Sequence, residues 1–205
     1  MTCQIYLISP PGIEANAFAS MLDQALSTKK VAAFQLRLKD IPDEDILHAC
    51  SILMPISHRY GVPFILNDRA DLAHQAGADG VHVGEEDYAC RKARTLIGPN
   101  KTIGVSCYNS IDRAMEAGEH GADYVSFGAF YPTTTKVPKA TATIDLLSKW
   151  TEMSTLPCTA IGGITDNNCH ALAKAGADFI AVISYVWNHP EGVVPALTAL
   201  QRNID

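Results

Sequence analysis

Short apolar runs rich in Val, Ile and Phe alternate along the chain with longer segments of helical period. This alternation is typical of parallel strands joined by crossover helices. One helical segment, from Asp43 to Tyr60, places Ile46, Cys50 and Leu53 on a single face, as expected for a helix packed on a sheet. We expect eight strand–helix pairs, with strands at Gln4–Ser9, Val31–Lys39, Pro63–Asn67, Gly80–Val83, Thr102–Ser106, Tyr124–Phe127, Pro157–Ile161 and Phe179–Ile183.

A short string recurs three times before a predicted strand: a glycine followed by Ala-Asp, at Gly77, Gly121 and Gly176. Each glycine suits a left-handed helix cap, and successive copies lie about two strand–helix units apart. A doubly wound open sheet would give a similar alternation. The position of the polar residues, at the carboxyl ends of the strands, favours an α/β fold of the (β/α)8 TIM-barrel type, in which such residues converge on one site.

Composition bounds the size and the partners of the protein. A chain of 205 residues with 47% hydrophobic and 19% charged residues suits one TIM-barrel domain spanning residues 1–205. The formal net charge of -6 would repel a phosphate backbone or an anionic membrane surface, so we expect neither nucleic acid nor membrane as a partner. Any phosphate site must therefore be local.

Several features predict a cytoplasmic protein. The chain opens Met1-Thr2-Cys3-Gln4 without a basic stretch before a long apolar segment, so we expect no signal peptide. Its longest apolar run, from Phe179 to Trp187, is too short to span a membrane. The six cysteines form no C-x-x-C pair, and we expect them to be reduced core residues rather than zinc ligands.

The second predicted strand carries a row of polar side chains. Alternation places Gln35, Arg37 and Lys39 on one face and the apolar residues between them on the other. Barrel strands are buried on both faces, where unpaired cations are costly, so this row would point at a charged ligand in the barrel mouth. An edge strand with a solvated face explains the pattern equally well.

Two acids, Asp68 and Asp87, follow adjacent predicted strands. Held at the rim, they could bind Mg²⁺, which typically uses one or two carboxylates together with phosphate oxygens and water. Taken singly, each acid is better explained as a helix N-cap. His82, inside the fourth strand, is interpreted as a structural residue.

The other candidate residues follow later strands. The long loop from Gly128 to Lys136 gathers hydroxyls and a cation that could clamp a phosphate, although a mobile surface loop would have the same composition. Gly162-Gly163 and Ser184 follow the last two strands, where barrels commonly bind phosphate. Ser106 could donate to a ligand or cap a turn, and no Ser-His-Asp order or activated cysteine suggests covalent catalysis.

Taken in order, these strings resemble the thiamine phosphate synthase family over nearly the whole chain: Gln35-Leu36-Arg37-Leu38-Lys39, Asn67-Asp68-Arg69, the run from Ala78 to Asp87, Ile103 to Ser106, the Pro-Thr-x-Thr-Lys loop and Gly-Gly-Ile. The resemblance implies a magnesium-dependent transferase with two small phosphorylated substrates. A hydroxymethylpyrimidine diphosphate loses pyrophosphate, and the nitrogen of a hydroxyethylthiazole phosphate attacks the exposed carbon to give thiamine monophosphate.

The resemblance also implies roles for individual residues. The family's pyrimidine diphosphate site falls on Gln35, Leu36, Arg37, Leu38, Lys39, Asn67, Ser106 and Lys136, with Mg²⁺ on Asp68 and Asp87. The thiazole phosphate falls on Thr133, Thr134, Thr135, Gly163, Ile183 and Ser184. Arg37, Lys39, Ser106 and Lys136 would be the catalytic residues. The chain departs from the family at Leu38, Glu85, Tyr108, Ala129 and Tyr185.

Two other functions compete with this one. A thiazole tautomerase would share the barrel but usually lacks the Pro-Thr-x-Thr-Lys loop and the paired acids. A non-catalytic phosphate-binding barrel would keep the pocket without turnover. The sequence is compatible with a homo-oligomer but does not require one.

Overall fold

The computed structural model describes residues 2–84, 90–133, 135 and 137–204. Eight parallel strands close into a barrel in chain order, so the predicted TIM barrel is confirmed and the open sheet is excluded. Every strand has two neighbours, which also excludes an edge strand at Gln35. The strands are β1 Gln4–Ile8, β2 Val31–Leu36, β3 Phe64–Asn67, β4 Gly80–Val83, β5 Thr102–Tyr108, β6 Tyr124–Gly128, β7 Cys158–Ile161 and β8 Phe179–Val182.

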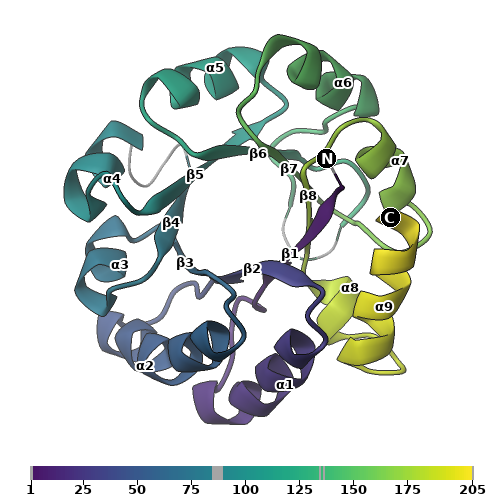
Figure 1. Ribbon diagram of the computed structural model, residues 1–205. Coiled ribbons are helices and arrows are strands. Elements are labelled where there is room, and N and C mark those ends of the chain that lie inside the picture. The colour runs from purple at the N-terminus through teal and green to yellow at the C-terminus, as the bar shows by residue number, and fades with distance from the viewer. Residues whose placement is uncertain (1, 85–89, 134, 136, 205) are drawn as a thin grey trace.

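Helices surround the barrel, and α9 packs against α1 to complete the ring (Figure 1). Their apolar faces and the outward side chains of the strands form one buried core. None of the described helices is long and apolar enough to cross a membrane. The helices are α1 Ala15–Ser27, α2 Asp43–Arg59, α3 Ala70–Ala76, α4 Cys90–Ile97, α5 Ile111–Glu119, α6 Ile144–Met153, α7 Cys169–Lys174, α8 Ser184–Trp187 and α9 Val193–Ile204.

The second strand is shorter than the sequence predicted. It pairs with its neighbours only as far as Leu36 and does not continue to Lys39. Beyond that point the backbone N–H of Arg37 donates to the Ser9 side chain at 2.8 Å, and that of Lys39 donates to the Pro11 carbonyl. The chain therefore leaves the sheet just where its cations begin, and these cations stand on the rim.

The recurring Gly-Ala-Asp string closes the amino-terminal end of the barrel. All three glycines have positive φ, as predicted. Each aspartate exchanges two hydrogen bonds with one residue of the preceding strand: its N–H donates to that residue's carbonyl, and its carboxylate accepts from that residue's N–H. The pairs are Asp79 with Phe64, Asp123 with Ile103, and Asp178 with Cys158. These aspartates therefore stabilise the fold at the end opposite the carboxyl rim.

Replacing Asp178 by Ala should lower the free energy of unfolding by about 1–2 kcal/mol, because the Cys158 N–H loses its acceptor at 2.8 Å. Urea denaturation measures this change. Asp178→Asn, which keeps an acceptor oxygen, should cost less. Turnover should stay unchanged in both variants, and lost turnover at wild-type stability would contradict a purely structural role.

Candidate active site

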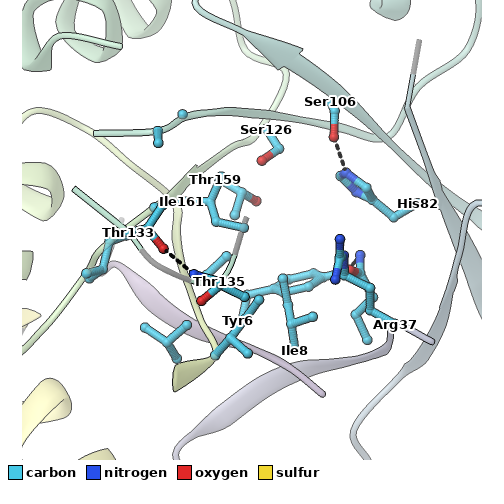
Figure 2. A pocket seen from close by; sticks show the side chains of 18 of the residues that line it. Tyr6, Ile8, Arg37, His82, Ser106, Ser126, Thr133, Thr135, Thr159 and Ile161 are labelled. Atoms are coloured by element: carbon cyan, nitrogen blue, oxygen red, sulfur yellow. Dashed lines mark hydrogen bonds between the residues drawn. The ribbon is translucent and has the colours of Figure 1, made fainter. Parts of the chain in front are cut away.

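A cavity of about 280 Å³ opens at the carboxyl ends of the strands. Most of the predicted site residues line it, so strands far apart in sequence supply one pocket (Figure 2). The predicted residues found in its wall are Gln35, Arg37, Lys39, Asn67, Asp68, Ser106, Thr133, Thr135, Gly163, Ile183 and Ser184.

Some predicted residues are not in this wall. The side chains of Leu36 and Leu38 are buried in the core between strands and helices, because they alternate with the pocket-facing residues of the same segment. Neither residue is among those that line the cavity. Asp87, Thr134 and Lys136 lie outside the described residues.

Cations dominate the described part of the rim. Arg37, Lys39 and Lys139 line the pocket, against a single described carboxylate, Asp68. The guanidinium of Arg37 makes no hydrogen bond or ion pair with any residue that the structure describes, and Figure 2 shows it directed into the pocket. Partial burial lowers the pKa of Arg37, an effect opposed by the charge of Asp68. In a protein with net charge -6, this rim selects an anion.

Asp68 is held on the rim by its backbone. Its N–H donates to the His82 carbonyl at 2.7 Å, and its φ of 67° lies in the left-handed region, which aspartate tolerates better than most residues. The alternative of a helix N-cap is wrong here, since Arg69 occupies the N-cap of α3. Instead the carboxylate forms an ion pair with Lys39.

Across the pocket, the loops after β6, β7 and β8 meet. The Thr135 and Ser184 hydroxyls lie 2.7 Å apart, which ties the threonine-rich loop to the start of α8. Gly163 has φ of 62°, and a Cβ there would lie 2.3 Å from the Pro132 carbonyl oxygen, so only glycine allows this approach. The loop thus forms part of the pocket wall, as the phosphate-clamp hypothesis requires of Thr133 and Thr135.

Below the rim, a polar cluster was not predicted from the sequence. His82 lines the pocket and bonds through Nε2 to Ser106 Oγ at 2.9 Å and through Nδ1 to Tyr124 Oη at 2.9 Å. His82 belongs to strand β4, as interpreted, but its ring also lines the pocket and contacts Ser106, and Ser106 caps no turn. Tyr6 and Tyr124 also face the cavity. The sequence offered one indication of this cluster: side chains alternate along each strand, and these residues fall on the inward-facing positions.

The site contains no activated nucleophile among its described residues. Ser106 and His82 are paired, but burial and the charge of Arg37 lower the His82 pKa to about 4, so the imidazole is a weak base. The six cysteines are free and buried, and burial raises the pKa of each thiol. The described residues of this site can therefore bind a ligand and stabilise its charge, but they offer no nucleophile for covalent catalysis.

Three of the departures from the family lie in the pocket wall: Tyr108, Ala129 and Tyr185. The Tyr108 ring is flanked by two cations, with the Lys139 ammonium 5.5 Å and the Arg113 guanidinium carbon 5.8 Å from its centroid. This contact joins the loop after β6 to the end of β5. None of the three replaces a charged residue of the rim.

Comparison with known proteins agrees with this geometry. The sequence profile described as thiamine monophosphate synthase matches residues 5–186. The chain belongs to this family. A thiamine-phosphate synthase of Rhodospirillum centenum is 53% identical over 200 residues, which cover 98% of this chain and 97% of that protein. The corresponding protein of Hyphomonas neptunium is 47% identical over 96% of this chain and 91% of its own length.

A solved structure supports the same assignment. Thiamine phosphate pyrophosphorylase from Pyrococcus furiosus superposes with a TM-score of 0.84 at 32% identity, covering 98% of this chain and 95% of that one. A 3-hexulose-6-phosphate synthase, at 19% identity and a TM-score of 0.70, shares only the fold. The activity of the chain is that of a thiamine-phosphate synthase, a transferase acting on small phosphorylated substrates.

The buried His82 should make stability depend on pH. Its pKa is about 4 in the folded protein against 6.5 as the ordinary value, so the unfolded chain binds more protons between these limits. Stability should therefore fall as pH drops through this window, by about 3 kcal/mol between roughly pH 7 and pH 4. Arg37 and Tyr124 are the other titratable groups in contact or coupled with this ring.

Urea denaturation of wild type and His82→Gln at several pH values measures this effect. The wild-type free energy of unfolding should approach or drop below that of the variant as pH falls. The exposed His74, replaced in the same way, serves as the control. The difference in free energy of unfolding between wild type and His74→Gln should stay nearly constant over the same pH range. A constant difference between wild type and His82→Gln would contradict a neutral buried imidazole.

Proposed function

We propose that the chain condenses 4-amino-2-methyl-5-hydroxymethylpyrimidine diphosphate with 4-methyl-5-(2-hydroxyethyl)thiazole phosphate, releasing pyrophosphate and thiamine monophosphate. The carbon–oxygen bond to pyrophosphate breaks first, and the thiazole nitrogen then attacks the methylene carbon. The observation that carries this proposal is the Arg37 guanidinium, directed into the pocket without a hydrogen-bond partner among the described residues.

The charges around the leaving group support a dissociative reaction. Negative charge grows on the pyrophosphate as its bond to carbon breaks, and preorganised cations stabilise it more strongly than water does. Arg37 and Lys39 supply such charge from the turn after β2. We assign the same role to Lys136, from the family motif. Ser106, deeper in the pocket, would add a hydrogen bond to the departing group.

The missing nucleophile fits the same scheme. A pyrimidine cation needs no covalent partner on the protein, only a thiazole ring held in line and exclusion of water. The second phosphate would anchor that ring through Thr133, Thr135 and Ser184, with the Gly163 and Ile183 backbone beside it. This anchor comes from β6, β7 and β8, whereas the described diphosphate cations Arg37 and Lys39 follow β2, so the two phosphate groups would be held mainly by different parts of the rim.

The donor set on the rim fits Mg²⁺ that is held jointly by protein and substrate. The described residues contain no group of three or more His, Cys, Asp or Glu side chains suited to a metal, so a cage made of protein alone is not expected there. Magnesium commonly uses one or two carboxylates and completes its shell with phosphate oxygens and water. Asp68, with Asp87 from the family motif, would hold the ion. When bound, it would neutralise part of the diphosphate charge.

A cytoplasmic location belongs to the same proposal. All six cysteines are free, and proteins of reducing compartments typically keep their thiols unpaired.

The purified protein, given both substrates and Mg²⁺, should release pyrophosphate and form thiamine monophosphate in equal amounts. Coupled detection of pyrophosphate and chromatography of the product measure the two. Isomerisation of the thiazole phosphate alone would indicate a tautomerase. Substrate binding without turnover would indicate the non-catalytic barrel, and either result would overturn the proposal.

Asp68→Asn should weaken Mg²⁺ binding by at least about tenfold, because the amide tolerates the left-handed backbone but lacks the charge. Calorimetric titration of Mg²⁺ in the presence of pyrophosphate measures this independently of turnover. Asp71→Asn is the matched control, since Asp71 bonds Arg69 outside the pocket. Equal Mg²⁺ affinity in wild type and Asp68→Asn would remove Asp68 from the metal site.

A further inference from the structure

Five side chains form a continuous hydrogen-bonded chain across the inside of the barrel. Gln35 Nε2 donates to Tyr6 Oη at 3.2 Å, and Tyr6 Oη lies 2.7 Å from Tyr124 Oη. Tyr124 Oη continues to His82 Nδ1 at 2.9 Å, and His82 Nε2 to Ser106 Oγ at 2.9 Å. Figure 2 shows the last of these bonds. The chain joins β2, β1, β6, β4 and β5 beneath the rim.

The direction assigned to the following bonds is the one in which the hydroxyl proton of each tyrosine has an acceptor within the chain. The amide of Gln35 donates to Tyr6, so the hydroxyl of Tyr6 is free to donate to Tyr124. In this arrangement Tyr124 accepts from Tyr6 and directs its own proton at Nδ1 of His82, 2.9 Å away. A neutral imidazole that accepts at Nδ1 carries its proton on Nε2.

The Nε2–H of His82 therefore donates to Ser106, and the Ser106 proton points away from the imidazole toward the pocket. With the opposite tautomer, Nε2 would accept the Ser106 proton. An oxygen lone pair would then face the anionic leaving group, and the interaction would be repulsive. The choice of tautomer thus decides whether Ser106 is a donor to the substrate.

We propose that Tyr124 is a positioning residue for the synthase reaction: through His82 it makes the Ser106 hydroxyl a hydrogen-bond donor toward the pocket. The Tyr124 hydroxyl lies between Tyr6 on one side and His82 on the other, so its effect on Ser106 passes through His82. The kinetic part of this inference rests on the proposed role of Ser106 in the synthase reaction.

The barrel is built to accommodate this tyrosine. Gly104 on β5 lies against the ring, and a Cβ at that position would be 2.0 Å from Tyr124 Cζ, so the position requires glycine. Burial raises the pKa of both Tyr6 and Tyr124 and lowers that of His82 to about 4. The chain therefore stays neutral, and its direction is constant, over the range in which the enzyme would work.

Nitrogen NMR of protein with ¹⁵N-labelled histidine tests the direction without any substrate. The His82 signal, identified by its loss in His82→Gln, should show the Nε2–H tautomer in the wild type. In Tyr124→Phe the Nδ1–H form should appear, because the hydroxyl that donates to Nδ1 and keeps it unprotonated has gone. A wild-type Nδ1–H tautomer, or an unchanged spectrum in Tyr124→Phe, would overturn the proposal even if the enzyme is fully active.

Kinetics of a double-mutant cycle supply the second test. Tyr124→Phe should lower kcat by at least about tenfold with little change in KM for the thiazole phosphate. In a Ser106→Ala background the same change should have almost no further effect, because there is no hydroxyl left to orient. Full additivity would show that Tyr124 does not act through Ser106.

Tyr60→Phe is the matched control, since it removes a tyrosine hydroxyl bonded to Asp23 at the periphery. It should change neither the His82 spectrum nor kcat. Thermal unfolding of each variant verifies the fold. If the wild type lacked synthase activity, the proposed function would fail while the NMR result would still decide the orientation of Ser106.

Discussion

Closure of the barrel imposes the constraint on which the site depends. Every second side chain of each strand points into an interior closed to water at its lower end, and every polar group there needs a partner. Aromatic and aliphatic side chains, among them Tyr6, Ile8, Ile65 and Tyr124, fill this interior. The hydrogen-bonded chain from Gln35 to Ser106, which includes the hydroxyls of Tyr6 and Tyr124, satisfies polar atoms of this interior. Thr159 Oγ1 is the one buried side-chain polar atom found without a partner in the described part of the protein.

Interior and rim therefore have different chemistry. The interior is neutral, because burial keeps the tyrosines protonated and the imidazole uncharged. The cations begin only where β2 leaves the sheet, and there Arg37 and Lys39 are in reach of water and ligand. If these cations stood two residues earlier on β2, inside the barrel, each would carry the desolvation cost of an unpaired buried charge. The end of the strand ladder thus sets the depth at which a diphosphate can be held.

The sequence predicts the parts of this arrangement that follow from local periodicity. Eight apolar runs located the eight strands to within three residues at each end, and the glycine before each Ala-Asp was correctly expected in a left-handed conformation. Gln35, Arg37, Asp68 and Ser106 were recognised because polar residues directly follow or close a buried strand. The end of β2 was placed too late, since alternation continues through Lys39 while the hydrogen bonds turn to Ser9 and Pro11.

Tyr6, His82 and Tyr124 could not be found in this way, for a physical reason. Alternation along one strand can give an inward face, but it does not tell which inward side chains of different strands lie side by side. That follows from the pairing of β1 with β8, of β4 with β5 and of β5 with β6. Their meeting in one chain requires the whole barrel to close, since the bonds link residues as far apart as Tyr6 and Tyr124. A serine at the end of one strand thereby depends for its orientation on residues from four others.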